Sequence, residues 1–229
     1  PQKVVTVEER EHPTAFVEYG FDINTQRGLE VAATFGERNI LGKALTGNVS
    51  TLLGKERQNF NVEVGKPDLF GYRIYNNVKA SYTNDQTYVG FTLVTVSGEV
   101  GFSWEIQEKR RFTLIYKLER QDPVHVEPDF DAALAPAPVR IGSLTPTISV
   151  DERDDPFLTT RGWFFLLRDK VSRKYLGGDA DFDRWEIDGR KYQTTWAGLT
   201  LAGAVRIGYA NVAEGSTLPV GERYYVGGA

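Results

Sequence analysis

Hydrophobic and polar residues alternate along most of the chain, in segments of about nine to thirteen residues that end at turn-forming residues. In one such segment, Leu29, Val31 and Phe35 fall on one face, whereas Glu30 and Thr34 fall on the other. A period of two is that of a β-strand with one apolar and one polar face. Helical periodicity is nearly absent, so the pattern predicts an all-β fold.

The turn residues divide the chain into about eleven antiparallel strands. The predicted strands cover residues 15–23, 29–38, 43–54, 56–66, 72–84, 95–106, 111–121, 142–152, 161–173, 180–194 and 196–210. Residues 85–94 fit either a loop or a strand extension, and residues 122–141 and 211–229 are expected to be loops. Short turns therefore alternate with longer connections, which is typical of outer-membrane barrels.

The strands favour a membrane environment over water. Several are longer than the usual soluble strand of about five or six residues. The run Gly162–Leu167 contains five large apolar residues in succession, which a soluble edge strand would avoid as an aggregation hazard. We therefore predict a transmembrane antiparallel β-barrel. A soluble β-sandwich or jelly roll is the alternative fold.

Composition agrees with this prediction. No stretch of about 18 apolar residues occurs, so no transmembrane helix is expected. Aromatic residues make up 12% of the chain, as suits strands with interfacial aromatic girdles. The chain has no cysteine, which excludes disulfides and thiolate metal sites, and its net charge of -4 gives no reason to expect nucleic-acid binding. It has no leader and no methionine, so we expect a processed or truncated piece.

Candidate chemistry is sparse. His12 and His125 are the two histidines, and neither has a serine motif or metal-ligand spacing around it. We therefore expect both to be exposed to solvent and the protein not to be an enzyme. No cofactor or metal is predicted.

Two acidic stretches have structural explanations. Asp179, Asp181 and Asp183 begin like a calcium loop, but Arg184 and Arg190 occupy the positions that need glycine and glutamate. We expect these three carboxylates to be solvated surface charges. Asp151, Asp154 and Asp155 precede a proline and are expected to form a turn through bonds to local backbone N–H groups.

Four stretches, in this order, resemble the barrel of the BamA/TamA-type outer-membrane assembly factor superfamily, the bacterial surface antigen family. Residues 16–42 resemble its opening hairpin, and Pro67–Gly71 resembles its turn after the fourth strand. Asp151–Gly162 is similar to its turn between the eighth and ninth strands, and Leu218–Gly228 to the approach to its sixth extracellular loop. The motif positions that carry the resemblance are Pro67, Gly71, Asp151, Asp154, Pro156, Gly162, Glu222, Arg223, Gly227 and Gly228.

The resemblance implies a domain organisation. Residues 1–13 resemble the end of a periplasmic POTRA domain, and residues 14–229 correspond to the N-terminal two-thirds of the barrel. The family's barrel has about sixteen strands, of which about eleven are expected here, so the sheet should be open. The family's Val-Arg-Gly-Phe segment follows Gly-Gly, and this chain ends at Ala229 before it.

The resemblance also implies a function in the bacterial outer membrane: assembly or insertion of β-barrel proteins, or translocation of a partner. The first strand would be a lateral seam that pairs with a substrate strand by β-augmentation. The seam residues would be Ala15, Phe16, Val17, Glu18, Tyr19, Gly20, Phe21, Asp22 and Ile23. Expected partners are outer-membrane lipid, unfolded β-barrel proteins and periplasmic or lipoprotein subunits. A two-partner-type secretion pore and a soluble β-rich binding domain are the alternatives.

Overall fold

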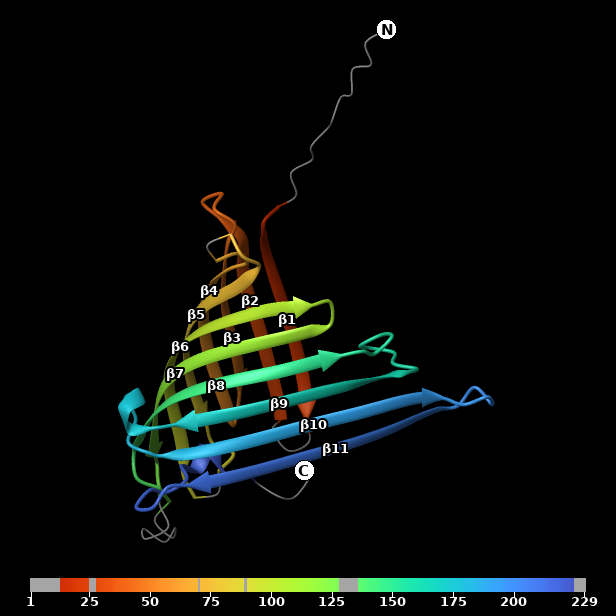
Figure 1. Cartoon of the computed structure of the whole chain (residues 1–229). Helices are drawn as coiled ribbons and strands as arrows, with labels where there is room; N and C mark the ends of the chain where they lie inside the picture. Colours follow the sequence, from red (N-terminus) through yellow and green to blue (C-terminus); the bar gives the residue numbers. More distant parts are fainter. Residues whose placement is uncertain (1–12, 25–27, 70, 89, 128–135, 225–229) are drawn as a thin grey trace.

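A computed structural model describes residues 13–24, 28–69, 71–88, 90–127 and 136–224, and Figure 1 shows their arrangement. The strands are β1 (Ala15–Asn24), β2 (Gly28–Ile40), β3 (Leu45–Gly54), β4 (Arg57–Lys66), β5 (Ile74–Asp85), β6 (Thr92–Gln107), β7 (Arg110–Val124), β8 (Val139–Asp151), β9 (Gly162–Ser172), β10 (Phe182–Thr194) and β11 (Thr200–Val212). Two short 3-10 helices, η1 (Lys174–Leu176) and η2 (Val220–Glu222), follow β9 and β11. Among the described residues, no helix is long and apolar enough to cross a membrane.

The strands form a single curved sheet in which each strand pairs antiparallel with its neighbours in sequence. The order runs from β1 to β11 without a crossover, and β1 and β11 are not paired with each other. The all-β, antiparallel and open character predicted from the sequence is confirmed. A meander of this kind follows from short connections, because consecutive strands joined by tight turns become neighbours.

The two faces of the sheet differ in character. The outer face carries large apolar side chains that are exposed, among them Val31, Phe60, Val100 and Ile207. The inner face carries charged side chains. Glu63, Lys79, Glu99 and Lys117 are successive cross-strand partners from β4 to β7 and lie in one row on this face. An exposed apolar face opposite a polar face is the arrangement of a barrel that meets lipid outside and water inside.

Most predicted strand limits hold within a few residues, but three differ. Of the stretch 85–94, Asp85 ends β5 and Thr92 begins β6, and the described residues between them belong to neither strand. β7 and β8 extend into the predicted loop 122–141. Pro123 lies within β7, opposite Leu93, although its residue type favours a loop. Pairing with neighbouring strands therefore extends these elements beyond what local composition indicates.

The third difference is at the start of β11. Residues 195–199 form a turn in which the Thr195 N–H donates to the Leu199 carbonyl. Gly198 there has a φ of 77°, a conformation that glycine adopts without strain. Trp196, predicted to begin a strand, is instead fully exposed in this turn.

Buried apolar residues are few and lie at one end of the sheet. One cluster joins Phe91, Leu93 and Val220, and a second joins Ile141, Ala180 and Phe182. Both clusters involve the segment after β11, because Leu218 packs against the second one. Residues 213–224, called here the return segment, thus connect to the loops that precede β6, β8 and β10.

Candidate functional site

The first candidate site is the free edge of β1. This strand pairs with β2 along its whole length, and its other edge has no partner among the residues that the structure describes. The Arg38 N–H donates to the Thr14 carbonyl at 3.0 Å, which fixes the phase of the antiparallel ladder. Because hydrogen-bonded residues alternate along such a ladder, the backbone groups of the odd-numbered residues of β1 face the free edge.

The predicted seam residues Ala15–Ile23 all lie in β1, and their side chains divide by face. Ala15, Val17, Tyr19, Phe21 and Ile23 share the outer face, and the last four are 68%, 87%, 76% and 75% exposed. Phe16, Glu18, Gly20 and Asp22 share the inner face. The residues with free backbone groups are therefore the ones whose side chains point toward lipid.

The opposite edge of the sheet is β11, which pairs only with β10 among the described strands. The Ala213 N–H donates to the Asp181 carbonyl at 3.0 Å, so the even-numbered residues of β11 carry the free backbone groups. Many of these even positions are small, namely Ala202, Ala204, Gly208 and Ala210. The two edges thus present different surfaces, large and apolar at β1 and small at β11.

The second candidate site is a chain of ion pairs on the inner face. Glu119 pairs with Lys117 at 2.5 Å and with Lys170 at 3.2 Å, and Lys170 also pairs with Glu222. Arg184 pairs with Glu222 at 3.0 Å and with Glu186 at 2.7 Å. Seven charges of alternating sign, ending at Arg168, connect β7, β9, β10 and the return segment.

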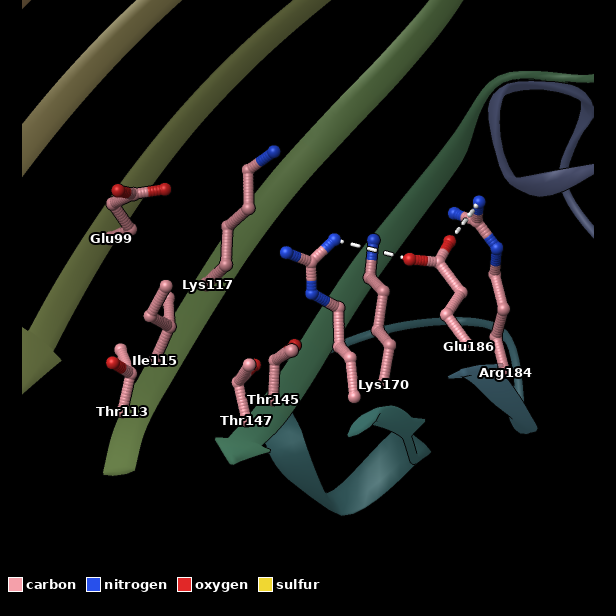
Figure 2. A pocket seen from close by; sticks show the side chains of 10 residues that line it. Glu99, Thr113, Ile115, Lys117, Thr145, Thr147, Lys170, Arg184 and Glu186 are labelled. Carbon is pink, nitrogen blue, oxygen red and sulfur yellow. Dashed lines mark hydrogen bonds and ion pairs between the residues drawn. The ribbon is translucent and has the colours of Figure 1, made fainter. Parts of the chain in front are cut away.

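These side chains border a hollow of about 320 Å³ on the inner face, shown in Figure 2. Lys117 and Glu99 lie on one side of the hollow, whereas Lys170, Arg184 and Glu186 lie on the other. Threonine hydroxyl groups at Thr145 and Thr147 lie between them. The hollow is lined mainly by polar and charged side chains, which suits a water-filled barrel interior.

The sequence by itself assigned no role in ion pairing to the cations Lys117, Lys170 and Arg184. Period two assigns each of them to the inner face, but their partners depend on the register of four separate strands and segments. The available signal was charge at inward positions, such as Lys117 and Glu119 two residues apart in β7.

The return segment carries two of the motif residues, Glu222 and Arg223. Glu222 is 4% exposed and is the only member of the ion-pair chain that does not come from a strand. Arg223 is exposed, and its Nε donates to the Leu218 carbonyl at 3.2 Å. Next to them, the Tyr224 hydroxyl donates to the Trp185 carbonyl at 2.8 Å, and the Arg184 guanidinium lies 4.6 Å from the Tyr224 ring. The other two motif residues, Gly227 and Gly228, lie outside the described residues.

The turn between β8 and β9 contains the predicted bonds from acidic side chains to backbone N–H groups. Asp154 Oδ1 accepts from the N–H groups of Asp155, Thr160 and Arg161, and Asp155 Oδ1 from those of Phe157 and Leu158. The bonds that Asp154 accepts, foremost the one from the Thr160 hydroxyl, hold the pKa of Asp154 well below its usual range.

The same turn is bounded by two further motif residues. Asp151 pairs with Arg153 at 2.7 Å, and the Arg153 Nη1 donates to the Pro156 carbonyl. Gly162 has a φ of 111°, and a Cβ atom there would lie 2.3 Å from the Glu152 carbonyl oxygen. This turn therefore requires glycine at its end.

The earlier turn motif, Pro67–Gly71, connects β4 to β5. Leu69 and Tyr72 exchange backbone hydrogen bonds across it, at 3.1 and 3.0 Å. Gly71 has a φ of 82°, which explains glycine at this motif position. Pro67 and Gly71 thus shape a connection at the same end of the sheet as the Asp154 turn, since both follow even-numbered strands.

The acidic stretch at the start of β10 agrees with the expectation of solvated charges at Asp179, which is exposed, but Asp181 and Asp183 are only partly exposed. Asp183 makes a bidentate pair with Arg173 at 2.7 and 2.9 Å, and Asp181 accepts the Lys174 N–H at 2.7 Å. Asp179 accepts the Arg140 N–H at 3.1 Å. The three carboxylates therefore fasten the loop with η1 to its neighbours. Within the described ranges, no group of histidine, cysteine or acidic residues has a metal-binding arrangement.

Comparison with known proteins decides the family. The model of the Omp85 superfamily domain matches residues 39–229, which is most of the chain. The chain belongs to the Omp85 superfamily. It is an outer-membrane β-barrel protein of the BamA type, as its resemblance predicted.

Two BamA proteins show how this Omp85 chain relates to longer relatives. The outer membrane protein assembly factor BamA of Nitratidesulfovibrio vulgaris is 25% identical over 232 residues, which cover 97% of this chain and 28% of that protein. The crystal structure of BamA from Haemophilus ducreyi lacking POTRA domains 1-3 has a TM-score of 0.85 at 14% identity. That similarity covers 96% of this chain and 45% of the other, and it shows the same fold. The chain therefore spans less than a third of its curated relative.

Proposed function

We propose that this chain acts in the assembly of outer-membrane β-barrel proteins, through the free edge of β1. The observation that carries the proposal concerns the odd-numbered residues Ala15, Val17, Tyr19, Phe21 and Ile23: their side chains point outward, and their edge-facing backbone groups have no partner among the residues that the structure describes. The sequence relationship to a BamA assembly factor supports it. The substrates would be unfolded β-barrel proteins, and periplasmic or lipoprotein subunits would be further partners.

The physical basis is the high free energy of an open strand edge in lipid. Each backbone group left without a hydrogen bond in the hydrocarbon region costs several kcal/mol. A substrate strand that pairs with β1 satisfies these groups on both strands by β-augmentation. Because backbone groups provide the pairing, one edge can accept strands of many sequences. No catalytic side chain is needed for this process.

The test uses the full-length protein in phospholipid vesicles and an unfolded outer-membrane protein as substrate. Phe21→Pro removes an edge-facing N–H, whereas the matched control Phe21→Ala removes the same side chain and keeps the N–H. We expect the rate of substrate insertion to fall at least about tenfold in Phe21→Pro and to change little in Phe21→Ala. Equal insertion rates in both variants would refute the role of the β1 edge.

A further inference from the structure

One side chain of β1 differs from all the others. Phe16 is half-buried, whereas every other described side chain of this strand is exposed. Its ring lies on the inner face over Gly36 of β2, its cross-strand partner. A Cβ atom at Gly36 would lie 2.3 Å from Phe16 Cζ, so the ring occupies the space that a side chain would fill there.

Two contacts reinforce this position. The Arg38 guanidinium lies 4.9 Å from the centre of the Phe16 ring, a cation–π geometry. The Thr14–Arg38 backbone bond lies immediately beside it. In contrast, the central Gly20 pairs with Ala32, and a Cβ atom at Gly20 would meet nothing within 4 Å. Side-chain packing between β1 and β2 is therefore concentrated at the Phe16 end.

The location of this packing matters because the two ends of β1 are held differently. At Asn24, only residues 25–27 separate β1 from β2, so chain connectivity keeps this end close to its partner. Among the described residues, no short connection joins the Ala15 end to a neighbouring strand, and an edge strand should fray there first. Phe16 lies at the end that would otherwise open.

We propose that Phe16 is a positioning residue that pins the open end of β1 to β2, through its contact with Gly36 and Arg38. This contact is called the clasp below. It keeps β1 attached to the sheet while the unpacked middle, around Gly20, adjusts to an incoming strand. The inference deepens the proposed function and rests on it for its purpose, but the clasp can be measured on its own.

The experiment is residue-resolved amide hydrogen exchange of the full-length protein in lipid nanodiscs. The amides of Glu18 and Asp22 both face β2, near the clasp and near the connecting turn respectively. With the clasp intact, we expect the two amides to exchange at rates within about threefold of each other. Phe16→Ala should accelerate exchange at Glu18 about tenfold and leave Asp22 unchanged, given the size of a half-buried ring and an exposed cation–π contact.

Three further variants test the mechanism. Phe16→Trp keeps a ring over the glycine and should restore slow exchange at Glu18. Gly36→Ala should accelerate it in the parent protein but add little in the Phe16→Ala background, because the displaced ring is already absent. Tyr75→Ala removes another ring that lies over a glycine, Gly65 in β4, and should leave β1 unchanged.

Fast exchange at Glu18 in the parent protein would overturn the clasp, and so would the absence of acceleration in Phe16→Ala. Acceleration of Glu18 by Tyr75→Ala as large as that by Phe16→Ala would also overturn it, since general loss of stability would then explain both. Insertion measured with Phe21→Pro is independent of these rates. If the clasp exists but the β1 edge does not pair with substrate, the exchange rates will respond to Phe16→Ala while insertion will not differ between Phe21→Pro and Phe21→Ala.

Discussion

Glu222 should control whether the return segment stays on the inner face of the sheet. Its side chain is 5% exposed and contacts Lys170 and Arg184. Glu222→Gln removes its charge while nearly keeping its size. Each charge-assisted hydrogen bond contributes about 1.5–3 kcal/mol. In this variant Lys170 still pairs with Glu119, and Arg184 still pairs with Glu186. We therefore take the lower limit of about 1.5 kcal/mol for each of the two bonds to Glu222, which gives a total loss of about 3 kcal/mol.

A loss of this size raises the population of the detached segment by a factor of about 150, since about 1.4 kcal/mol corresponds to tenfold. The assay is maleimide labelling of a Val220→Cys reporter, because Val220 belongs to the return segment, is buried at 8% exposure, and the chain has no cysteine of its own. We expect labelling to become faster by about two orders of magnitude in Glu222→Gln.

The matched control is Glu214→Gln, which removes the same charge from an exposed position of the same segment. It should leave the labelling rate unchanged. A labelling rate in Glu222→Gln equal to that of the parent would refute the claim that the ion pairs hold the segment.

Three other predictions concern the turns and the faces of the sheet. Gly162→Ala should lower the free energy of unfolding by about 1–3 kcal/mol, because φ is positive there and the Glu152 carbonyl leaves no room for a Cβ atom. Urea titration measures this loss, and it should show a smaller one for Gly198→Ala, where the space around the glycine is open. Because the folded pKa of Asp154 lies below its ordinary value of 3.8, the ionised carboxylate stabilises the turn at neutral pH. That stabilisation should decline as the pH falls below 3.8, seen as faster amide exchange in the turn, and Asp154→Asn should lose this pH dependence. Val62→Arg on the outer face should destabilise the protein in vesicles by about 2–4 kcal/mol if it lies at mid-membrane, and Asn61→Arg on the inner face by much less; equal losses would contradict the assignment of the faces.

The sequence determines the faces and the turns of this protein because both depend on local properties. Alternation along β4 separates Phe60 and Val62 from Asn59 and Asn61 without knowledge of any partner strand. The aspartates of the turn after β8 accept hydrogen bonds from residues close in sequence, so their role could be predicted. The resemblance of ordered motifs to the Omp85 superfamily also rests on local stretches.

Only the tertiary structure determines which inner residues meet. Lys170 and Glu119 are 51 residues apart, and Glu222 joins them from a segment that lacks strand periodicity. The contact of Phe16 with Gly36 needs the register of β1 on β2, which a shift of one residue would destroy. Pairing also extends β7 through Pro123, against its local preference. The alternation along one strand determines which face of the sheet a residue occupies. Its neighbour on that face depends on the register between two strands, which neither strand determines alone.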